Sequence, residues 1–151
     1  MKSLTICSSA AFYEEVMRFK DIFEAKGIHT LVPENAETMR AKQDFDISHY
    51  KTWYENDADY VEKTRLMRGH FDKVAEGDVT LVVNNEKHGV ENYIGGKALM
   101  EMSLAFYLNK PIYLLNDIPE DSSFVEEIKG MKVISLHGDI DPLIRALTEG
   151  N

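Results

Sequence analysis

The sequence predicts an α/β domain in which helices cover both faces of a parallel β-sheet. Five short runs rich in Val, Ile and Leu alternate with longer segments of helical spacing, and such alternation produces parallel sheets. The run at 79–83 is apolar on both faces, as a central strand between two helical layers must be. A length of 151 residues suits one domain with a full core, so we expect a single domain over residues 1–151.

The first crossover connection is the most regular helical pattern in the chain. A helix is expected from Ala11 to Lys26, and Gly27 ends it. Its apolar side chains recur at spacings of three and four, so they share one stripe: Phe12, Val16, Phe19 and Phe23. The five expected strands cover residues 4–7, 30–32, 79–83, 112–115 and 133–136.

Residues 33–48 are polar and have too little apolar content for a core element, so we interpret them as a loop. A long helix is expected from about Thr52 to Ala75, before Gly77. Its apolar stripe is expected at Tyr60, Thr64, Met67, Phe71 and Val74.

The remaining helices complete the topology. One runs from Gly95-Gly96 to about Asn109, and the last begins after Asp141-Pro142 and closes at Gly150. Five parallel strands joined by crossover helices in this length correspond to a flavodoxin-like, or Rossmann-like, three-layer sandwich with strand order 2-1-3-4-5.

The amino-acid composition indicates which classes of binding partner are disfavoured. The chain has 17 Lys and Arg against 26 Asp and Glu, a net charge of -9, and this excess of acid disfavours duplex nucleic acid and anionic membranes. No apolar run approaches the roughly 20 residues needed to cross a bilayer. The single Cys7 cannot form an internal disulfide, and the first residues lack the apolar stretch of a signal peptide, so we expect a cytoplasmic protein with a small-molecule ligand.

Parallel sheets of this kind bind ligands beyond the carboxyl ends of the strands, where the strand order reverses. Here that point lies between the first and third strands, at Ser8 and Ser9 and at Asn84 and Asn85. The polar loop at 84–93 is expected to hang over this crevice and to contribute specificity.

Glu101 is the most informative residue, because the helix around it is otherwise apolar on nearly every side. It falls on the face of Ala98 and Ala105, which should pack on the sheet. Burying an ionised carboxylate costs several kcal/mol unless it is paired. The residue is therefore either a structural acceptor for neighbouring amides or hydroxyls, or a functional carboxylate.

Other candidates each have a structural and a functional interpretation. Ser8 and Ser9 either cap the first helix or bind a phosphate or sugar oxygen. Tyr13 either packs or points its phenol into the crevice, and His70 is either a half-buried structural imidazole or a general acid or base. Gly95 and Gly96 would let the backbone approach a ligand closely.

Several classes of site are disfavoured. No GxGxxG motif follows the first strand and the chain has no Walker-type lysine motif, so dinucleotide and P-loop chemistry are not expected. Cys7 is interpreted as a small buried hydrophobe. With one cysteine and no metal-ligand spacing among the five histidines, we expect neither a metal nor an organic cofactor: the histidines are His29, His49, His70, His88 and His137.

The segment at 77–115 resembles the core of the nucleoside 2-deoxyribosyltransferases and the related nucleoside-monophosphate N-glycosidases. In that family an aDvvva strand leads through a glycine-containing loop to an E(I/L/M)GxAxxLgKpi helix and strand. The run EMSLAFYLNKPI, residues 101–112, matches that register without a gap, and the opening TICSSAAFYEEV resembles the family's first strand and turn. The resemblance covers about two thirds of the chain.

The resemblance implies roles for particular residues. Glu101 would be the nucleophile that attacks the anomeric carbon, forming a glycosyl-enzyme ester that water or another base resolves. Ser9 would lie at the turn that contacts sugar or phosphate, and Tyr13 would hydrogen-bond the nucleophile. His70 stands where the family often has Asp, and Ser103 where it has Gly, so a divergent branch with a different substrate is indicated.

The function expected from this resemblance is cleavage or exchange of the N-glycosidic bond of a nucleoside or nucleotide. The candidate substrate contacts are Ser8, Ser9, Asn84, Asn85, Asn92, Tyr93, Gly95 and Gly96. A homo-oligomer, dimer or higher, is also implied, with Trp53 and Tyr54 as exposed aromatics for a contact. The alternative is a module of the same fold that senses a nucleotide without turning it over.

Overall fold

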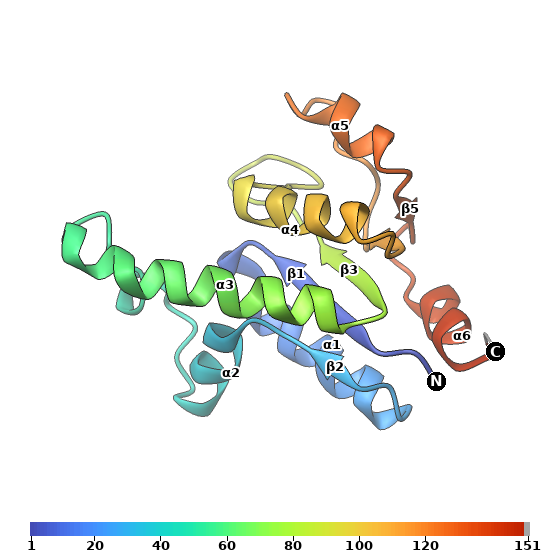
Figure 1. The fold of residues 1–151 in the computed structure, drawn as a ribbon, viewed down its shortest axis with the longest axis horizontal. Helices are drawn as coiled ribbons and strands as arrows, with labels where there is room; N and C mark the ends of the chain where they lie inside the picture. The colour runs from blue at the N-terminus through green and yellow to red at the C-terminus, as the bar shows by residue number, and fades with distance from the viewer. Residues whose placement is uncertain (150–151) are drawn as a thin grey trace.

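A computed structural model describes residues 1–149 and shows a five-stranded, all-parallel sheet in the order β2-β1-β3-β4-β5 (Figure 1). This confirms the flavodoxin-like architecture expected from the sequence. The strands are β1 (Leu4–Ser8), β2 (Thr30–Leu31), β3 (Val79–Val83), β4 (Ile112–Leu114) and β5 (Ile134–Ser135).

Helices cover both faces of the sheet, as the apolar strands require. They are α1 (Tyr13–Ala25), α2 (Glu34–Ala41), α3 (Tyr60–Glu76), α4 (Gly96–Tyr107), α5 (Val125–Gly130) and α6 (Asp141–Glu149). In Figure 1, α3 and α4 lie in front of the sheet and α1 lies behind it. Buried side chains of α1 and α6 form one core cluster, and those of α3, α4 and α5 form the other.

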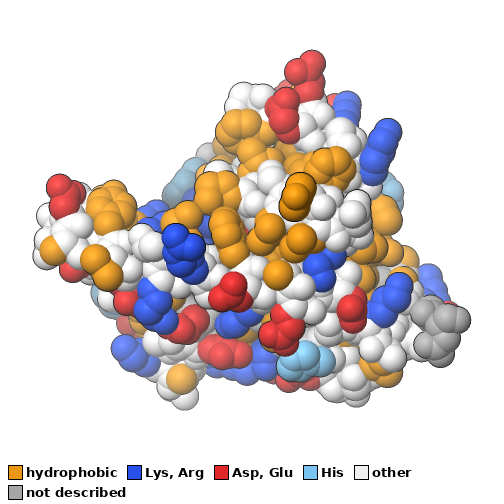
Figure 2. Space-filling view, viewed as in Figure 1, with side chains coloured by type: hydrophobic (Ala, Val, Ile, Leu, Met, Phe, Trp, Pro, Cys, Tyr) orange, Lys and Arg blue, Asp and Glu red, His pale blue; other side chains and the backbone are white. Residues whose placement is uncertain are grey.

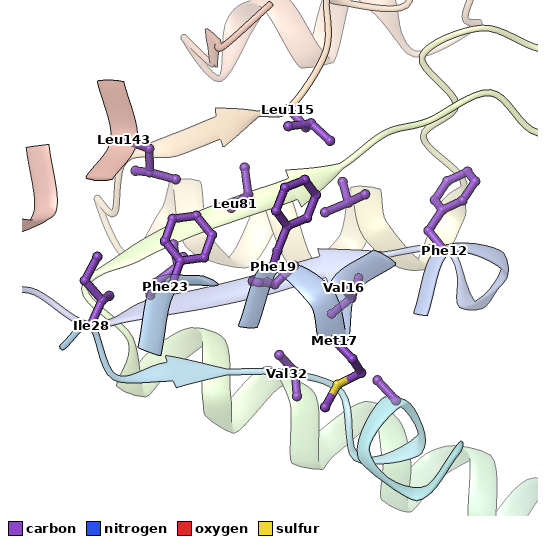
Figure 3. Close-up of a cluster of buried hydrophobic side chains, with 14 of the residues drawn as sticks. Phe12, Val16, Met17, Phe19, Phe23, Ile28, Val32, Leu81, Leu115 and Leu143 are labelled. Atoms are coloured by element: carbon purple, nitrogen blue, oxygen red, sulfur yellow. The ribbon is translucent and has the colours of Figure 1, made fainter. Parts of the chain in front are cut away.

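The residues of each central strand alternate between these two cores. Leu4 and Ile6 of β1 join the cluster under α1, whereas Cys7 joins the cluster under α3 and α4. Figure 3 shows the first cluster, where Phe19 and Phe23 of α1 project from the helix toward the sheet. The aromatic stripe expected from the sequence is therefore the face of α1 that packs on the sheet.

The register of the central strands fixes the position of the crevice. β1 pairs with β3 over five residues, from Leu4 with Val79 to Ser8 with Val83. Because the two strands end at the same level, the turn after Ser8 and the loop after Val83 leave the sheet side by side. This is the point where the strand order reverses, between β1 and β3.

The prediction of a loop over residues 33–48 is wrong in part, because residues Glu34–Ala41 form α2. Two residues three positions apart, Ala36 and Met39, are enough to anchor this helix, and both are buried against the core under α1. A 3-10 turn follows at Ile47–His49. An apolar face of only two residues is too weak a pattern to separate from a polar loop.

The long helix also begins later than expected. A 3-10 turn at Asp57–Asp59 precedes α3, and Asn56 caps that turn by accepting a hydrogen bond from the Ala58 amide at 3.1 Å. The expected stripe is shifted: Tyr60 and Thr64 are exposed, and the fully buried residues of α3 are His70 and Val74. The short helix α5 was not expected, and the expected end of α6 at Gly150 lies outside the described residues.

Within residues 1–149, no helix is long and apolar enough to cross a lipid bilayer.

Candidate active site

Glu101 lies in the middle of α4, on the face that packs against the sheet, and its side chain is only 1% exposed. Ala98 and Ala105 flank it on the same face and are buried as expected. These small residues let the helix approach the strands closely. Among the described residues, the Oε1 atom of Glu101 has no hydrogen-bond partner. The sequence-based expectation of a buried carboxylate is confirmed.

Three chemically reactive side chains converge on this point from three elements. Cys7 comes from the end of β1, His70 from α3 and Glu101 from α4. The Cys7 Sγ and His70 Nε2 atoms are 3.5 Å apart, and one ligand atom from each of the three residues lies within 4.8 Å of the others. All three residues are buried. The Nδ1 atom of His70 also has no hydrogen-bond partner within residues 1–149.

A lysine that sequence reasoning missed lies next to this cluster. Lys97 is one helical turn before Glu101, so both project from the same face of α4. Its ammonium donates hydrogen bonds to the Tyr13 hydroxyl and, at 3.2 Å, to the backbone carbonyl of Ser8. The ammonium also lies 4.8 Å from the centre of the Tyr13 ring. These contacts join the turn after β1 to the start of α4.

Burial dominates the electrostatics of the site. It raises the pKa of Glu101, against the opposing effects of the Lys97 charge and of the Cys7 thiol beside the carboxyl. Burial also raises the pKa of Tyr13, so the phenol is protonated and its oxygen accepts from Lys97. The pKa of Lys97 is raised by Tyr13 and Glu101, which together outweigh the opposing effect of its own burial.

His70 is held in its neutral form. Burial, with smaller contributions from the charges of Lys97 and Lys73, lowers its pKa to about 3. At neutral pH the imidazole therefore carries one N–H and one free nitrogen lone pair. This favours a contact role for His70 over that of an imidazolium proton donor.

A pocket of about 60 Å³ lies beside this cluster: His70 lines it, whereas Cys7 and Glu101 are not among its lining residues within 1–149. Its lining includes Tyr13, His70, Lys97, Trp53, Lys63 and Glu34. The expectation that Trp53 is an exposed dimer contact is wrong. Its side chain is only 8% exposed: the ring lines the pocket, and its centre lies 5.1 Å from the Lys63 ammonium. Tyr54 beside it is exposed.

Ser8 and Ser9 have separate roles in the turn after β1. Ser9 caps the following 3-10 turn, Ala10–Phe12, by accepting a hydrogen bond from the Ala11 amide at 3.3 Å. The Ser8 hydroxyl donates to the carbonyl of Ser9 at 2.8 Å. Lys87, from the loop after β3, also reaches Ser9 and donates to its hydroxyl at 3.0 Å. The expected position of this loop over the crevice is therefore found in the structure.

The asparagines after β3 form a structural network. The buried Asn84 donates to the Asp117 carbonyl at 3.0 Å and accepts from the Asn116 amide at 2.8 Å. Asn85 accepts from the Asn116 side chain at 3.1 Å and donates to Glu15 at 3.4 Å. These bonds tie the loop after β3 to the loop after β4, so Asn84 supports the crevice instead of facing it.

The other expected contacts are not among the lining residues of the pocket beside His70 within 1–149. Asn92 and Tyr93 line a second, open hollow with residues 117–123 of the loop after β4. Tyr93 fills the space beside Gly95: a Cβ on that glycine would be 2.8 Å from the Tyr93 hydroxyl. A Cβ on Gly96 would have no neighbour within 4 Å. Of these two glycines, only Gly95 is closely packed, and it packs against the Tyr93 side chain of this protein instead of leaving room for a ligand.

The structure brings together Ser8, Tyr13, His70 and Glu101 of the expected set, and adds Cys7, Lys63 and Lys97. Lys97 could have been found from its spacing of four residues from Glu101. Cys7 and Lys63 give no such local signal. No protein-family model matches this chain, and no curated protein matches it. The resemblance to the nucleoside 2-deoxyribosyltransferases therefore stays a prediction.

Proposed function

We propose that this protein cleaves or exchanges the N-glycosidic bond of a nucleoside or nucleotide, with Glu101 as the nucleophile. The observation that supports this most directly is the carboxylate itself. It is buried beside Cys7 near the carboxyl end of β1, its Oε1 atom has no partner among the described residues, and it lies within 4.8 Å of His70, which lines a pocket. A purely structural acceptor would satisfy both of its oxygens.

The chemistry proceeds in two displacements. A Glu101 oxygen attacks the anomeric carbon, the C–N bond breaks, and its electron pair leaves with the base, which takes up a proton. Water or a second base then attacks the same carbon and releases the carboxylate. Lys97 stabilises the ionised form of Glu101 that the attack needs, because its charge opposes the rise in pKa caused by burial.

Tyr13 and His70 complete the machinery of this proposal. Because Lys97 donates to the Tyr13 oxygen, the phenolic proton is free to contact the carboxylate or a sugar hydroxyl. His70 is neutral and contacts the sugar through its ring nitrogens. Ser8 and Ser9 lie at the sugar or 5′ end of the substrate.

Two ammonium groups line the pocket of a chain whose net charge is -9. Within residues 1–149, neither Lys63 nor Lys97 forms an ion pair within 4 Å. Lys97 interacts with the Glu101 charge, and the one carboxylate in the lining, Glu34, is already paired with Arg65. The positive charge that remains at Lys63 favours a ligand that bears an anionic group. Nucleotides are thus better candidates than nucleosides. The pocket is smaller than a whole nucleotide, so the base would extend through its open side.

A homo-oligomer is part of the same proposal. Figure 2 shows apolar side chains gathered over the face that carries α4, and three of the exposed residues of this helix are Met100, Phe106 and Tyr107. Tyr107 is 80% exposed. An apolar face of this kind on the helix that holds Glu101 would place a second copy close to the site.

The test is chromatography of ribo- and deoxyribonucleosides, their 5′-monophosphates and NAD after incubation with the protein. Wild type should release or exchange a base, and Glu101→Gln should not. Glu55→Gln, a change at an exposed glutamate, is the matched control and should retain turnover. Full activity of Glu101→Gln would refute the role of the nucleophile.

The alternative is a nucleotide-sensing module, which the small pocket also allows. It predicts that a nucleotide raises the melting temperature and is recovered chemically unchanged from wild type. Turnover of any member of the pool by wild type alone would exclude it.

A further inference from the structure

We propose that Cys7, His70 and Glu101 form a binding site for a thiophilic divalent cation, Zn²⁺, and that occupation of this site withdraws Glu101 from other chemistry. The inference goes beyond the proposed function and does not depend on it. It concerns reversible metal binding to the same buried cluster, and this binding can be measured whether or not the protein turns over a nucleotide.

The three side chains are a common zinc set. Thiolate, imidazole and carboxylate all bind Zn²⁺, and sites with three protein ligands leave a fourth position for water. With metal–ligand bonds of roughly 2.0–2.3 Å, the edge of a tetrahedral site is about 3.5 Å long. The Cys7 Sγ to His70 Nε2 distance already equals this edge at 3.5 Å. The three ligand atoms lie within 4.8 Å of one another, so a small rotation of the Glu101 side chain completes the triangle.

The unpartnered atoms of the cluster are a second, independent observation. The Glu101 carboxyl is 1% exposed and His70 is 3% exposed, and each has a buried polar atom with no hydrogen-bond partner among residues 1–149. Buried polar groups in folded proteins are nearly always satisfied, by protein, water or an ion. A cation bound through His70 Nε2 would engage the unpartnered Glu101 oxygen, whereas His70 Nδ1, on the other side of the ring, is not one of its ligands.

Charge and access also suit a divalent ion. A Cys7 thiolate and a Glu101 carboxylate together balance two positive charges, and the thiol proton is released to solvent on binding. The nearest competing cation is Lys97, whose ammonium is directed to Tyr13 and Ser8; within residues 1–149 it makes no ion pair with Glu101 inside 4 Å. The His70 wall of the pocket provides the route from solvent.

The sequence gives no sign of this site because its ligands are far apart, at positions 7, 70 and 101. Zinc motifs are recognised by short spacings between ligands, whereas here each ligand comes from a different element. Metal bound in this way would use the Glu101 oxygens that the proposed reaction needs. Zn²⁺ is thus expected to inhibit turnover, and a chelator to restore it.

The experiment is a titration of EDTA-treated, dialysed protein with Co²⁺, followed by competition with Zn²⁺. A thiolate-to-cobalt charge-transfer band should appear at one Co²⁺ per chain and disappear when Zn²⁺ is added. Zn²⁺ alone should raise the melting temperature of wild type. This readout is independent of turnover, so it separates failure of the metal site from failure of the proposed glycosyl chemistry.

Three variants make the test specific. Cys7→Ser should abolish the band, and Glu101→Gln should weaken Co²⁺ binding at least about tenfold while preserving the volume of the side chain. His49→Ala is the matched control: this exposed imidazole lies 2.6 Å from Asp44 and 3.5 Å from Asp46, and its loss should change nothing at the buried site. No charge-transfer band in wild type, or binding that His49→Ala removes, would overturn the proposal.

Discussion

Replacing Glu101 by Gln should stabilise the fold at neutral pH. The folded protein holds the pKa of this carboxyl above its ordinary value of 4.5, chiefly because the group is buried. Below pH 4.5 the acid is protonated in both folded and unfolded chains. As pH rises from 4.5 through the raised folded value, the unfolded chain ionises before the folded one, so wild type loses stability that Gln retains.

The size of the effect follows from burial of the charge, because Gln would leave the same positions without partners but carries no charge. Burying an ionised group costs several kcal/mol and the Lys97 charge offsets part of this, so the net cost is taken as about 1–3 kcal/mol. For a chain of this length, each kcal/mol shifts Tm by roughly 2–4 °C. Glu101→Gln should therefore raise Tm by about 2–12 °C at neutral pH, and by much less near pH 4.

The assay is thermal unfolding followed by circular dichroism from pH 4 to pH 8, in a buffer that contains EDTA. Glu55→Gln, at an exposed position, is the control for loss of a surface charge. A Tm difference between Glu101→Gln and wild type that does not grow with pH would refute the reasoning, because it would show that the ionised carboxylate is satisfied in the folded state.

Three other changes test separate parts of the structure. Gly77→Ala should destabilise the protein by about 1–3 kcal/mol in urea unfolding, because the added Cβ would lie 2.2 Å from Thr5 Oγ1. Gly69→Ala, where the added Cβ meets open space on α3, should stabilise it by roughly 0.5–1 kcal/mol. Equal effects of the two substitutions on the free energy of unfolding would contradict the packing at Gly77. Asn84→Ala leaves a backbone amide and a carbonyl of the loop after β4 unpaired and should cost about 1–3 kcal/mol, so an unchanged urea midpoint would show that water replaces the network. Lys97→Met removes the charge that lowers the pKa of Glu101, so the acid limb of the kcat/KM profile should move to higher pH, and an unmoved limb would show that another group controls it.

The fold could be predicted because its signals are local. The Phe stripe of α1 and the apolar run of β3 each identify an element from within a few residues of sequence, and crossover helices leave few topologies open. α2 could not be predicted, because only Ala36 and Met39 anchor it and its other residues are those of a loop. The start of α3 was predicted too early because the turns before it contain no Gly or Pro that would mark the helix boundary.

The site was predictable only in part. A single carboxylate in an apolar helix indicated that Glu101 is buried, and the structure confirms this. Its neighbours Cys7 and His70 reach it from other elements, so no spacing in the sequence could reveal the cluster. Trp53 shows the opposite error, since this aromatic residue in a polar segment was predicted to be exposed but is buried in the lining of the pocket.

The edges of the sheet constrain how copies of this chain can associate. Both edge strands are very short: Thr30–Leu31 in β2 and Ile134–Ser135 in β5, each paired at only two positions. Strands this short offer few backbone groups to an incoming strand, which is how many natural sheets avoid edge-to-edge aggregation. Continuous sheets across two molecules, and fibrils built from them, are disfavoured for this fold. Assembly would have to proceed through helix faces, where the contact depends on side chains and can be altered one residue at a time.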